Sequence, residues 1–329
     1  MLLRENGGRD VSPEAVTSGQ FSGASSRHFL LNSQNPDGGW GYHPAAPSSA
    51  EATSWALLAL LSRAADPALA DACVGARAWL RRAQMPDGSW PAIPGQRQGC
   101  WVTSLAALAL HLEGSTPDAV VRGRDWLLDA WPADSNFWWR LRRVLARGTV
   151  VRQDNSLHGW SWTPGTASWV EPTAHALLFL RSLPAELLPP RAAKRRQLGE
   201  RMLYDRMCPG GGWNSGNPQV YGVAGMPRIG PTAWALLALL PHSQRAENQM
   251  SLDWLEAAYP RIRGAASLAL AHRCLQAYGR PVAPLTPGVG DLYLPNQFFK
   301  SVLTFAWIAW AESGEENRSS QTGGDKATA

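Results

Sequence analysis

Charged residues are scarce in this chain of 329 residues, in which Asp, Glu, Lys and Arg together make up 17%. The net charge of +5 is small and the basic residues are spread out, whereas a nucleic-acid-binding surface needs them concentrated. Cysteine is also scarce: the four cysteines form no C-x-x-C pair, which argues against a zinc knuckle and gives no reason to expect disulfides. We therefore expect no nucleic-acid partner, no metal site and no cofactor.

Long apolar runs are absent as well. No stretch approaches the roughly 18 consecutive apolar residues of a membrane-spanning helix. The start of the chain, MLLRENGGRD, lacks the apolar core of an export signal, so we expect a cytoplasmic protein. Hydrophobic residues, in contrast, make up 45% of the chain, which also holds 31 Gly, 25 Pro and 17 Trp. This composition is typical of buried helices joined by frequent turns, with Trp in repeated structural positions or lining a cavity.

A seven-residue phrase occurs twice: QNPDGGW, from Gln34 to Trp40, returns as QMPDGSW, from Gln84 to Trp90. The Pro-Asp-Gly step predicts a tight turn, because Pro presets φ and Gly tolerates a positive φ. A threonine follows the tryptophan at a constant spacing of thirteen residues in three units, and at nineteen in a fourth. The pairs are Trp40 and Thr53, Trp90 and Thr103, Trp160 and Thr173, and Trp213 and Thr232. A spacing that survives one insertion indicates an internal repeat.

Each unit predicts two helices of different character. Residues 71–84 place their apolar side chains on one stripe and their arginines off it, as a half-exposed helix does. Residues 53–61 are apolar on all sides and must be buried. Alternating outer and inner helices predict an all-α fold, an α/α toroid of about six helix pairs in one domain over residues 23–311. In this fold Gln34 would cap backbone groups at a helix terminus and Trp40 would pack over it, as a clasp between units.

The Q-x-x-x-G-x-W phrase resembles the QW motif of squalene-hopene and oxidosqualene cyclases, and the paired helices are similar to those of protein prenyltransferase β subunits. The resemblance covers about Phe29 to Trp310. It implies an isoprenoid-processing protein that binds a polyprenyl or triterpenoid substrate in a central funnel. The triterpene cyclases carry two such helical domains and this chain has room for one. Its own funnel must therefore serve alone, or a partner chain or second copy completes the cavity.

The same resemblance nominates an acid. Class II cyclases begin an inner helix with D-x-D-D-T-A, and alignment on Thr173 and Ala174 puts Glu171 at the middle, proton-donating position, with the other two acids missing. His175 lies two residues after Thr173 and would accept a proton or hold the carboxyl. Structural alternatives stand beside both roles. A carboxylate next to Pro172 suits any helix N-terminus, and Glu51 recurs at the same register. A histidine on an apolar helix is commonly a core residue.

Substrate binding is predicted for two sets of residues. Aromatic faces stabilise cationic intermediates, which makes Trp55, Trp169 and Trp234 candidates for the funnel wall. Asn214 and Asn217 belong to a loop rich in Gly, Asn and Pro between residues 208 and 232, which we expect at the rim of the ring.

The segment 132–157 is an insert whose apolar and aromatic side chains share one helical face and whose arginines lie on another. Three interpretations stay open: the insert packs on the barrel, lies on an anionic membrane surface as a peripheral contact, or binds a diphosphate. Residues 1–22 and 312–329 are polar and aperiodic, and we expect them to be disordered.

Three other functions stay open beside an isoprenoid-converting enzyme. The first is a non-catalytic isoprenoid-binding or assembly scaffold that kept the barrel and lost the acid. The second is a protein prenyltransferase β-subunit-like chain. Members of that family hold zinc with an Asp, a Cys and a His, and this sequence offers only a weak match in His272 and Cys274. The third is a carbohydrate-active α/α barrel, which the scarcity of acidic pairs disfavours.

Overall fold

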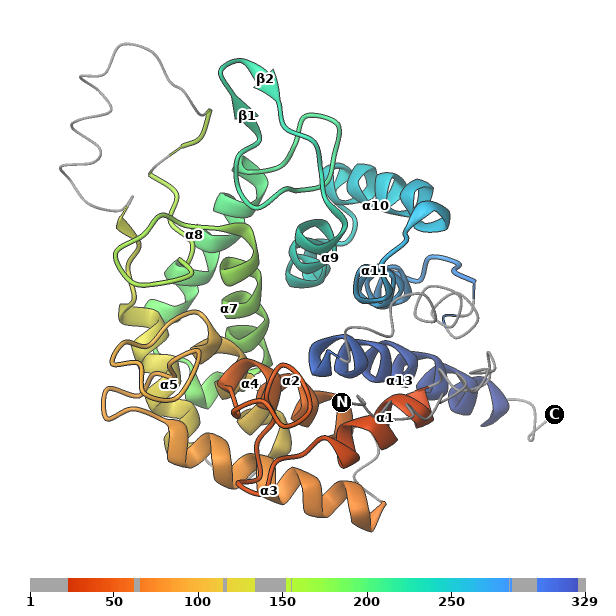
Figure 1. Cartoon of the computed structure of the whole chain (residues 1–329). Coiled ribbons are helices and arrows are strands. Elements are labelled where there is room, and N and C mark those ends of the chain that lie inside the picture. The colour runs from red at the N-terminus through yellow and green to blue at the C-terminus, as the bar shows by residue number, and fades with distance from the viewer. Residues whose placement is uncertain are drawn as a thin grey trace, which may run out of the picture.

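The computed structural model describes residues 23–61, 66–114, 117–133, 152–154, 156–283, 285 and 301–324, with side chains as far as residue 314. Within these ranges the helices form two concentric rings (Figure 1). The inner ring contains α2 (Ala50–Leu60), α4 (Val102–Glu113), α7 (Val170–Ser182), α9 (Ile229–Ala238), α11 (Ala265–Ala277) and α13 (Val302–Gly324). Each inner helix packs on the next, and α13 packs on α2, so the ring is closed.

The outer ring contains α1 (Gly23–Asn32), α3 (Pro67–Ala83), α5 (Pro117–Asp129), α8 (Arg191–Asp205) and α10 (Ala246–Ala258). Each outer helix packs against one or two inner helices: α3 lies against α2 and α4, α5 against α4, and α10 against α9 and α11. The described chain therefore has the all-α toroid that the repeat predicts.

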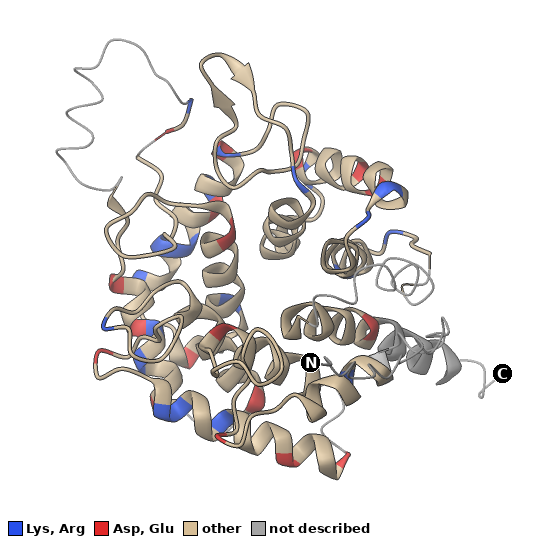
Figure 2. Cartoon of the chain, viewed as in Figure 1, with Lys and Arg blue, Asp and Glu red and all other residues tan. Residues whose placement is uncertain are grey.

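Burial explains which helix lies inside. In α2 every residue except Glu51 and Leu58 is buried, whereas α3 buries one stripe and exposes Arg81 and Arg82. Figure 2 shows that charged residues lie mainly on the outer helices and the connecting loops of the described chain. A helix without a polar face is stable in water only when neighbours surround it.

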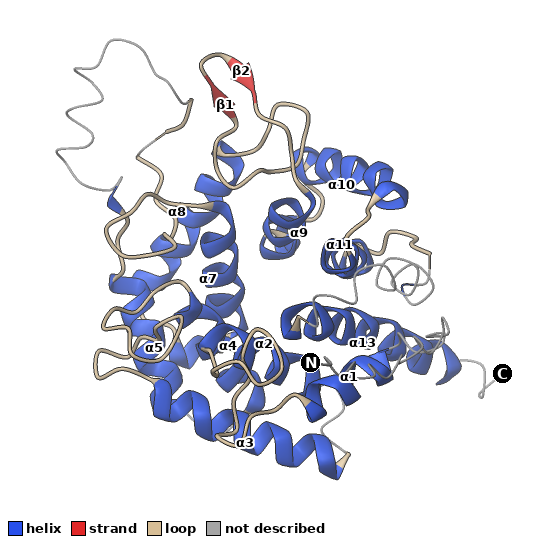
Figure 3. Ribbon diagram, in the orientation of Figure 1, coloured by secondary structure: helices blue, strands red, loops and turns tan. Residues whose placement is uncertain are grey.

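The short elements lie in the connections. Three 3₁₀ turns occur at η4 (Ala185–Leu187), η5 (Leu240–His242) and η6 (Tyr259–Arg261). Strands β1 (Gln219–Val220) and β2 (Val223–Ala224) form an antiparallel hairpin that projects from the ring (Figure 3). This hairpin is the insertion that stretches the fourth unit from thirteen to nineteen residues.

A hydrogen bond explains the constant spacing between Trp and Thr. The backbone N–H of Trp40 donates to Oγ1 of Thr53 at 2.9 Å, and the indole N–H of Trp40 donates to the carbonyl of Leu30 at 2.7 Å. The Trp90, Trp160 and Trp213 backbones donate in the same way to Thr103, Thr173 and Thr232. The threonine thus fastens each turn to the start of its inner helix.

The glutamine of the repeated phrase links consecutive units. Nε2 of Gln34 donates to the carbonyls of Gly38 and Ala72, both at 2.9 Å, and Gln84 makes the same pair of bonds with Gly88 and Ala119. The sequence predicted that Gln34 caps a helix terminus. Instead, Gln34 bonds the carbonyl of Ala72, which lies within the next outer helix, α3. The outer helix can come this close because Gly38 lies beside it.

Two predicted boundaries meet different outcomes. Helix α13 continues to Gly324, past residue 311 where composition places the end of the folded domain, because Glu312 and Ser313 are still buried against the ring. Residues 1–22 and most of the insert 132–157, including its aromatic face and all of its arginines except Arg152, lie outside the described residues. None of the helices in the described ranges combines the length and hydrophobicity needed to cross a bilayer.

Candidate active site

Aromatic side chains from five inner helices (α2, the start of α4, α7, α9 and α13) meet at the axis of the ring. We call this group the axial cluster; it consists of Trp55, Trp101, His175, Trp234, Trp307 and Trp310. Trp55 on α2 and Trp234 on α9 have ring centroids 5.2 Å apart, although their helices are not neighbours in the ring. Their contact means that indole rings fill the axis at this level. Both side chains are almost wholly buried, with exposures of 2% and 4%.

His175 lies inside this cluster, on α7. Its ring centroid is 4.6 Å from that of Trp234 and 5.3 Å from that of Trp101, on which it stacks. Neither ring nitrogen has a hydrogen-bond partner among the described residues. Burial lowers the pKa of His175 to about 3, because an imidazolium in this apolar setting would lose its hydration. The side chain is therefore a neutral imidazole at pH 7, able to take a proton only from a strong acid such as a carbocation.

Glu171 lies one turn earlier, at the N-terminus of α7. Its Oε1 accepts a hydrogen bond from the Ser215 hydroxyl at 3.0 Å, while its Oε2 is buried and has no partner in the described chain. Burial raises the pKa of Glu171 and outweighs the lowering by its own backbone N–H, by Ser215 and by the positive charge of Arg228. The carboxyl therefore holds its proton to a higher pH than an ordinary glutamate does.

Glu51 provides an internal comparison, because it occupies the same register on α2. Burial raises the pKa of Glu51 too, and the Tyr42 hydroxyl donates to its Oε2 at 2.7 Å. The recurrence agrees with the structural preference for a carboxyl at this position. What distinguishes Glu171 is the second carboxyl oxygen, which is buried without a partner.

The rim loop is fastened to the start of α7. The backbone N–H of Val170 donates to the carbonyl of Ser215 at 3.0 Å. The side chain of Asn214 is engaged within the loop: Oδ1 accepts from the backbone N–H of Gly216 and of Asn217, and Nδ2 donates to the carbonyl of Asn217. Asn217 is exposed and Trp169 is partly buried at the helix start. The structure thus groups Trp169, Asn214 and Glu171 at one end of α7.

Sequence reasoning missed three kinds of neighbour. Ser215 gave no signal, because its contact with Glu171 spans 44 residues. Trp307 and Trp310 are spaced as one face of a helix and could have been assigned to the axis from that spacing. Trp101 precedes the repeat threonine Thr103 by two residues and joins the cluster by stacking on His175.

The metal-ligand residues do not assemble. In the described ranges no three His, Cys, Asp or Glu side chains lie close enough to hold a metal ion. His272 contacts the Tyr259 hydroxyl and the Gln276 amide, at 2.9 and 2.8 Å, and Cys274 is a buried free thiol.

Comparisons with known proteins give a match to a family model and several solved structures of similar fold. Residues 23–131 match the family model of the squalene-hopene cyclase N-terminal domain. A comparison with curated proteins finds no match. The type II terpene cyclase MstE from Scytonema, as a variant in complex with its substrate geranylgeranyl dihydroxybenzoate, has a TM-score of 0.56 at 16% identity, over 91% of this chain and 98% of that chain.

Two further solved structures are similar. A protein from Actinoplanes has a TM-score of 0.58 at 16% identity, over 89% of this chain and 100% of that chain. The cellobiose 2-epimerase of Spirochaeta thermophila has a TM-score of 0.57 at 14% identity, over 88% and 93%. At these identities structural likeness establishes the fold alone. The fold and the family match together support the terpenoid cyclase-like superfamily as the class of this chain.

Proposed function

We propose that this protein converts an isoprenoid substrate by acid-initiated chemistry of the type II terpene cyclase kind, with Glu171 as the proton donor. The observation that supports this role is the buried, unpartnered Oε2 of Glu171. A proton on that oxygen has no acceptor in the described chain, so it is available to a bound substrate. The match to the squalene-hopene cyclase N-terminal domain favours an isoprenoid over other substrates of the fold.

In the proposed reaction the proton leaves Oε2 for the substrate and a carbocation forms. The carboxylate left behind is stabilised by the Ser215 hydroxyl, the backbone N–H of Glu171 and the nearby charge of Arg228. Indole faces of Trp55 and Trp234 stabilise the cation, and His175 takes up the proton released when the final alkene forms. Return of that proton to Glu171 closes the cycle. Trp169, Asn214 and Asn217 would contact the substrate at the rim.

The missing acids restrict the substrate. A carboxyl with a raised pKa is a weaker acid than one supported by neighbouring carboxyls, and protonating an isolated alkene demands a strong one. An epoxide or an allylic group is protonated more easily. We therefore propose an oxygen-bearing or allylic isoprenoid as the substrate.

A second candidate function is the non-catalytic scaffold, which either binds an isoprenoid or serves in assembly. The contact between Trp55 and Trp234 supports the assembly form, because a filled axis leaves an isoprenoid chain no room at that level unless the rings move apart. The carbohydrate-active and prenyltransferase alternatives find no such support among the described residues. A partner chain or second copy that completes the cavity stays a prediction.

We also propose peripheral membrane contact through the β1–β2 hairpin. Tyr221, Val223 and Met226 are 79%, 71% and 82% exposed, a concentration of large apolar side chains that water alone does not favour. Tyr221 has a positive φ of 49°, a conformation that costs a non-glycine residue free energy and often marks a functional site. The same loop carries Ser215, so a hairpin in lipid would hold the Glu171 end of the ring at the membrane surface.

The deciding experiment incubates the purified protein with squalene, oxidosqualene and geranylgeranyl diphosphate and analyses products by mass spectrometry. We expect a product from the wild type and a loss of at least about 100-fold in Glu171→Gln, the usual contribution of a general acid. Glu51→Gln is the matched control and should keep its activity. Unchanged turnover in Glu171→Gln would exclude the acid role, and substrate binding without product in the wild type would favour the scaffold.

A further inference from the structure

A cavity of about 300 Å³ lies off the axis, between the start of α4, the end of α5 and the start of α7. We call it the side cavity. Four indole side chains contribute to its wall, with Leu127 and Pro172 between them: Trp101, Trp126, Trp131 and Trp160. Its volume is at the lower end of the range for small-molecule sites, whose walls are typically apolar and aromatic.

The wall of the side cavity is held in place from outside. The Arg195 guanidinium lies 4.1 Å from the ring centroid of Trp160 and 4.3 Å from that of Trp131. Arg195 is itself buried and donates to the carbonyls of Ala130 and Gly159, at 2.9 and 3.1 Å. The indole N–H of Trp160 is also engaged, with the carbonyl of Leu127 at 2.8 Å. Two of the four rings are thus fixed before any ligand binds, which reduces the entropy cost of binding.

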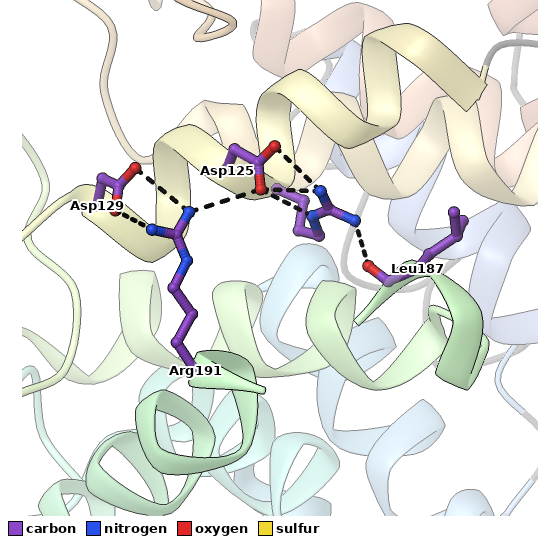
Figure 4. A network of polar contacts seen from close by, with 5 residues as sticks. Asp125, Asp129, Leu187 and Arg191 are labelled. Carbon is purple, nitrogen blue, oxygen red and sulfur yellow. Dashed lines mark hydrogen bonds and ion pairs between the residues drawn. The ribbon is translucent and has the colours of Figure 1, made fainter. Parts of the chain in front are cut away.

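Part of the polar lining is already hydrogen-bonded. The Ser104 hydroxyl donates to the carbonyl of Trp101 at 2.8 Å. Both carboxylate oxygens of Asp129 accept from Arg191, at 2.7 and 3.3 Å, within a network that also joins Asp125 to Arg191 (Figure 4). Within the described ranges, four polar groups of the lining make no hydrogen bond: the Ser161 hydroxyl and the indole N–H groups of Trp101, Trp126 and Trp131. The surface offered to a ligand is therefore mainly apolar.

These contacts decide between ligand classes. Aromatic cages bind organic cations, but they do so with free ring faces and often a free carboxylate. Here a guanidinium already lies against two of the rings, and Arg191 neutralises Asp129. Sugars stack on indoles as well, yet each sugar hydroxyl also needs an acceptor for its own proton. The free indole N–H groups of the lining can only donate, which leaves the Ser161 hydroxyl as the acceptor among the free side chains of the described lining. An uncharged hydrocarbon needs none and gains about 25 cal/mol for each Å² of apolar surface that it buries.

We propose that the side cavity is a binding site for the uncharged hydrocarbon part of a ligand, separate from the ring axis. Trp101 forms its inner wall and stacks on His175, so one indole separates the ligand from the axial cluster. The assignment of a prenyl chain as the natural occupant rests on the proposed function. The assignment of an uncharged apolar ligand does not.

The test measures binding by equilibrium dialysis with four probes: farnesol, 1-methylnaphthalene, tetraethylammonium and cellobiose. The first two separate a prenyl chain from an aromatic ring, and the others represent the cation and the sugar. Ala130→Leu and Ser161→Leu each add bulk to the cavity lining. The controls are Gln98→Leu, which places a leucine in a neighbouring depression, and Glu171→Gln.

We expect the wild type, Gln98→Leu and Glu171→Gln to bind at least one of the two apolar probes, farnesol and 1-methylnaphthalene, with equal affinity. Both cavity-filling variants should bind the same probe at least tenfold more weakly. Unfolding midpoints establish that each variant is folded, and two independent filling variants guard against the failure of one. Equal binding by the folded filling variants would overturn the proposal. So would the absence of hydrocarbon binding to the wild type, or a preference for the cation or the sugar. Loss of product in Glu171→Gln with intact hydrocarbon binding would separate this site from the proposed chemistry.

Discussion

Trp55 and Trp234 reach each other across the ring, with centroids 5.2 Å apart. Replacing Trp234 by Ala removes the partner of Trp55 and of His175 at once and leaves a hole on the axis. We expect the free energy of unfolding to fall by about 3–5 kcal/mol, the usual range for a buried Trp. Denaturant titration measures this. Trp131→Ala is the control, because Trp131 is 48% exposed and its loss should cost much less.

The threonine that recurs after each repeat tryptophan offers a cleaner pair of variants. Thr103→Val keeps the shape of the side chain but leaves the buried N–H of Trp90 without an acceptor, so we expect a loss of about 1–3 kcal/mol in unfolding free energy. Thr103→Ser keeps the hydroxyl and should cost only about 1 kcal/mol, for the lost methyl group. If Val and Ser cost the same, the hydrogen bond is not what fixes the spacing of the repeat.

His175 makes stability depend on pH in a predictable direction. Its folded pKa, about 3, is below the value of 6.5 for an exposed histidine, so between these values the unfolded state binds a proton that the folded state excludes. Stability is therefore unaffected by this group above pH 6.5 and falls as the pH drops below it, by at most about 1.4 kcal/mol per pH unit.

The variant His175→Phe tests this. We expect it to be more stable than the wild type at pH 7, by about 1–3 kcal/mol, because it removes two buried nitrogens that lack partners. The difference between the two proteins should widen from pH 6.5 to pH 4.5 in urea titrations. Glu171 and Glu51 have raised pKa values and act in the opposite direction, but they are common to both proteins and cancel in the difference. A constant difference would show that His175 is solvated or paired.

The hairpin proposal predicts binding to lipid vesicles. Changing Tyr221, Val223 and Met226 together to Ser should reduce co-sedimentation with vesicles of phosphatidylcholine and phosphatidylglycerol at least tenfold, since the inserted apolar area is lost. Val74→Ser combined with Leu112→Ser removes exposed apolar side chains from α3 and α4, at 49% and 54% exposure, and should have no effect. Equal loss in both variants would mean that binding is a general property of the surface.

The ring of paired helices could be predicted well from the sequence, because the repeat that encodes it is a pattern of residues close together in the chain. The spacing of Trp40 and Thr53 is a direct record of one hydrogen bond, and the all-apolar helices leave no alternative to an inner position. The site was predicted less completely. Glu171 and His175 were nominated from their register on one helix and stay predictions as site residues, whereas Ser215, which contacts Glu171, approaches from another unit through a loop of irregular length. The packing of Trp55 on Trp234 depends on how the ring closes, which no local pattern records.

The contact of α1 and α2 with α13 has a consequence for synthesis of the protein. Phe29 stacks on Phe305 with centroids 3.8 Å apart, so the first and last described helices complete one another. Until residues beyond 301 leave the ribosome, the apolar faces of α1, α2 and α11 lack the helix α13 on which they pack. For most of its translation the nascent chain is therefore an unclosed ring of helices with exposed apolar surface. We expect it to bind chaperones that shield such surface.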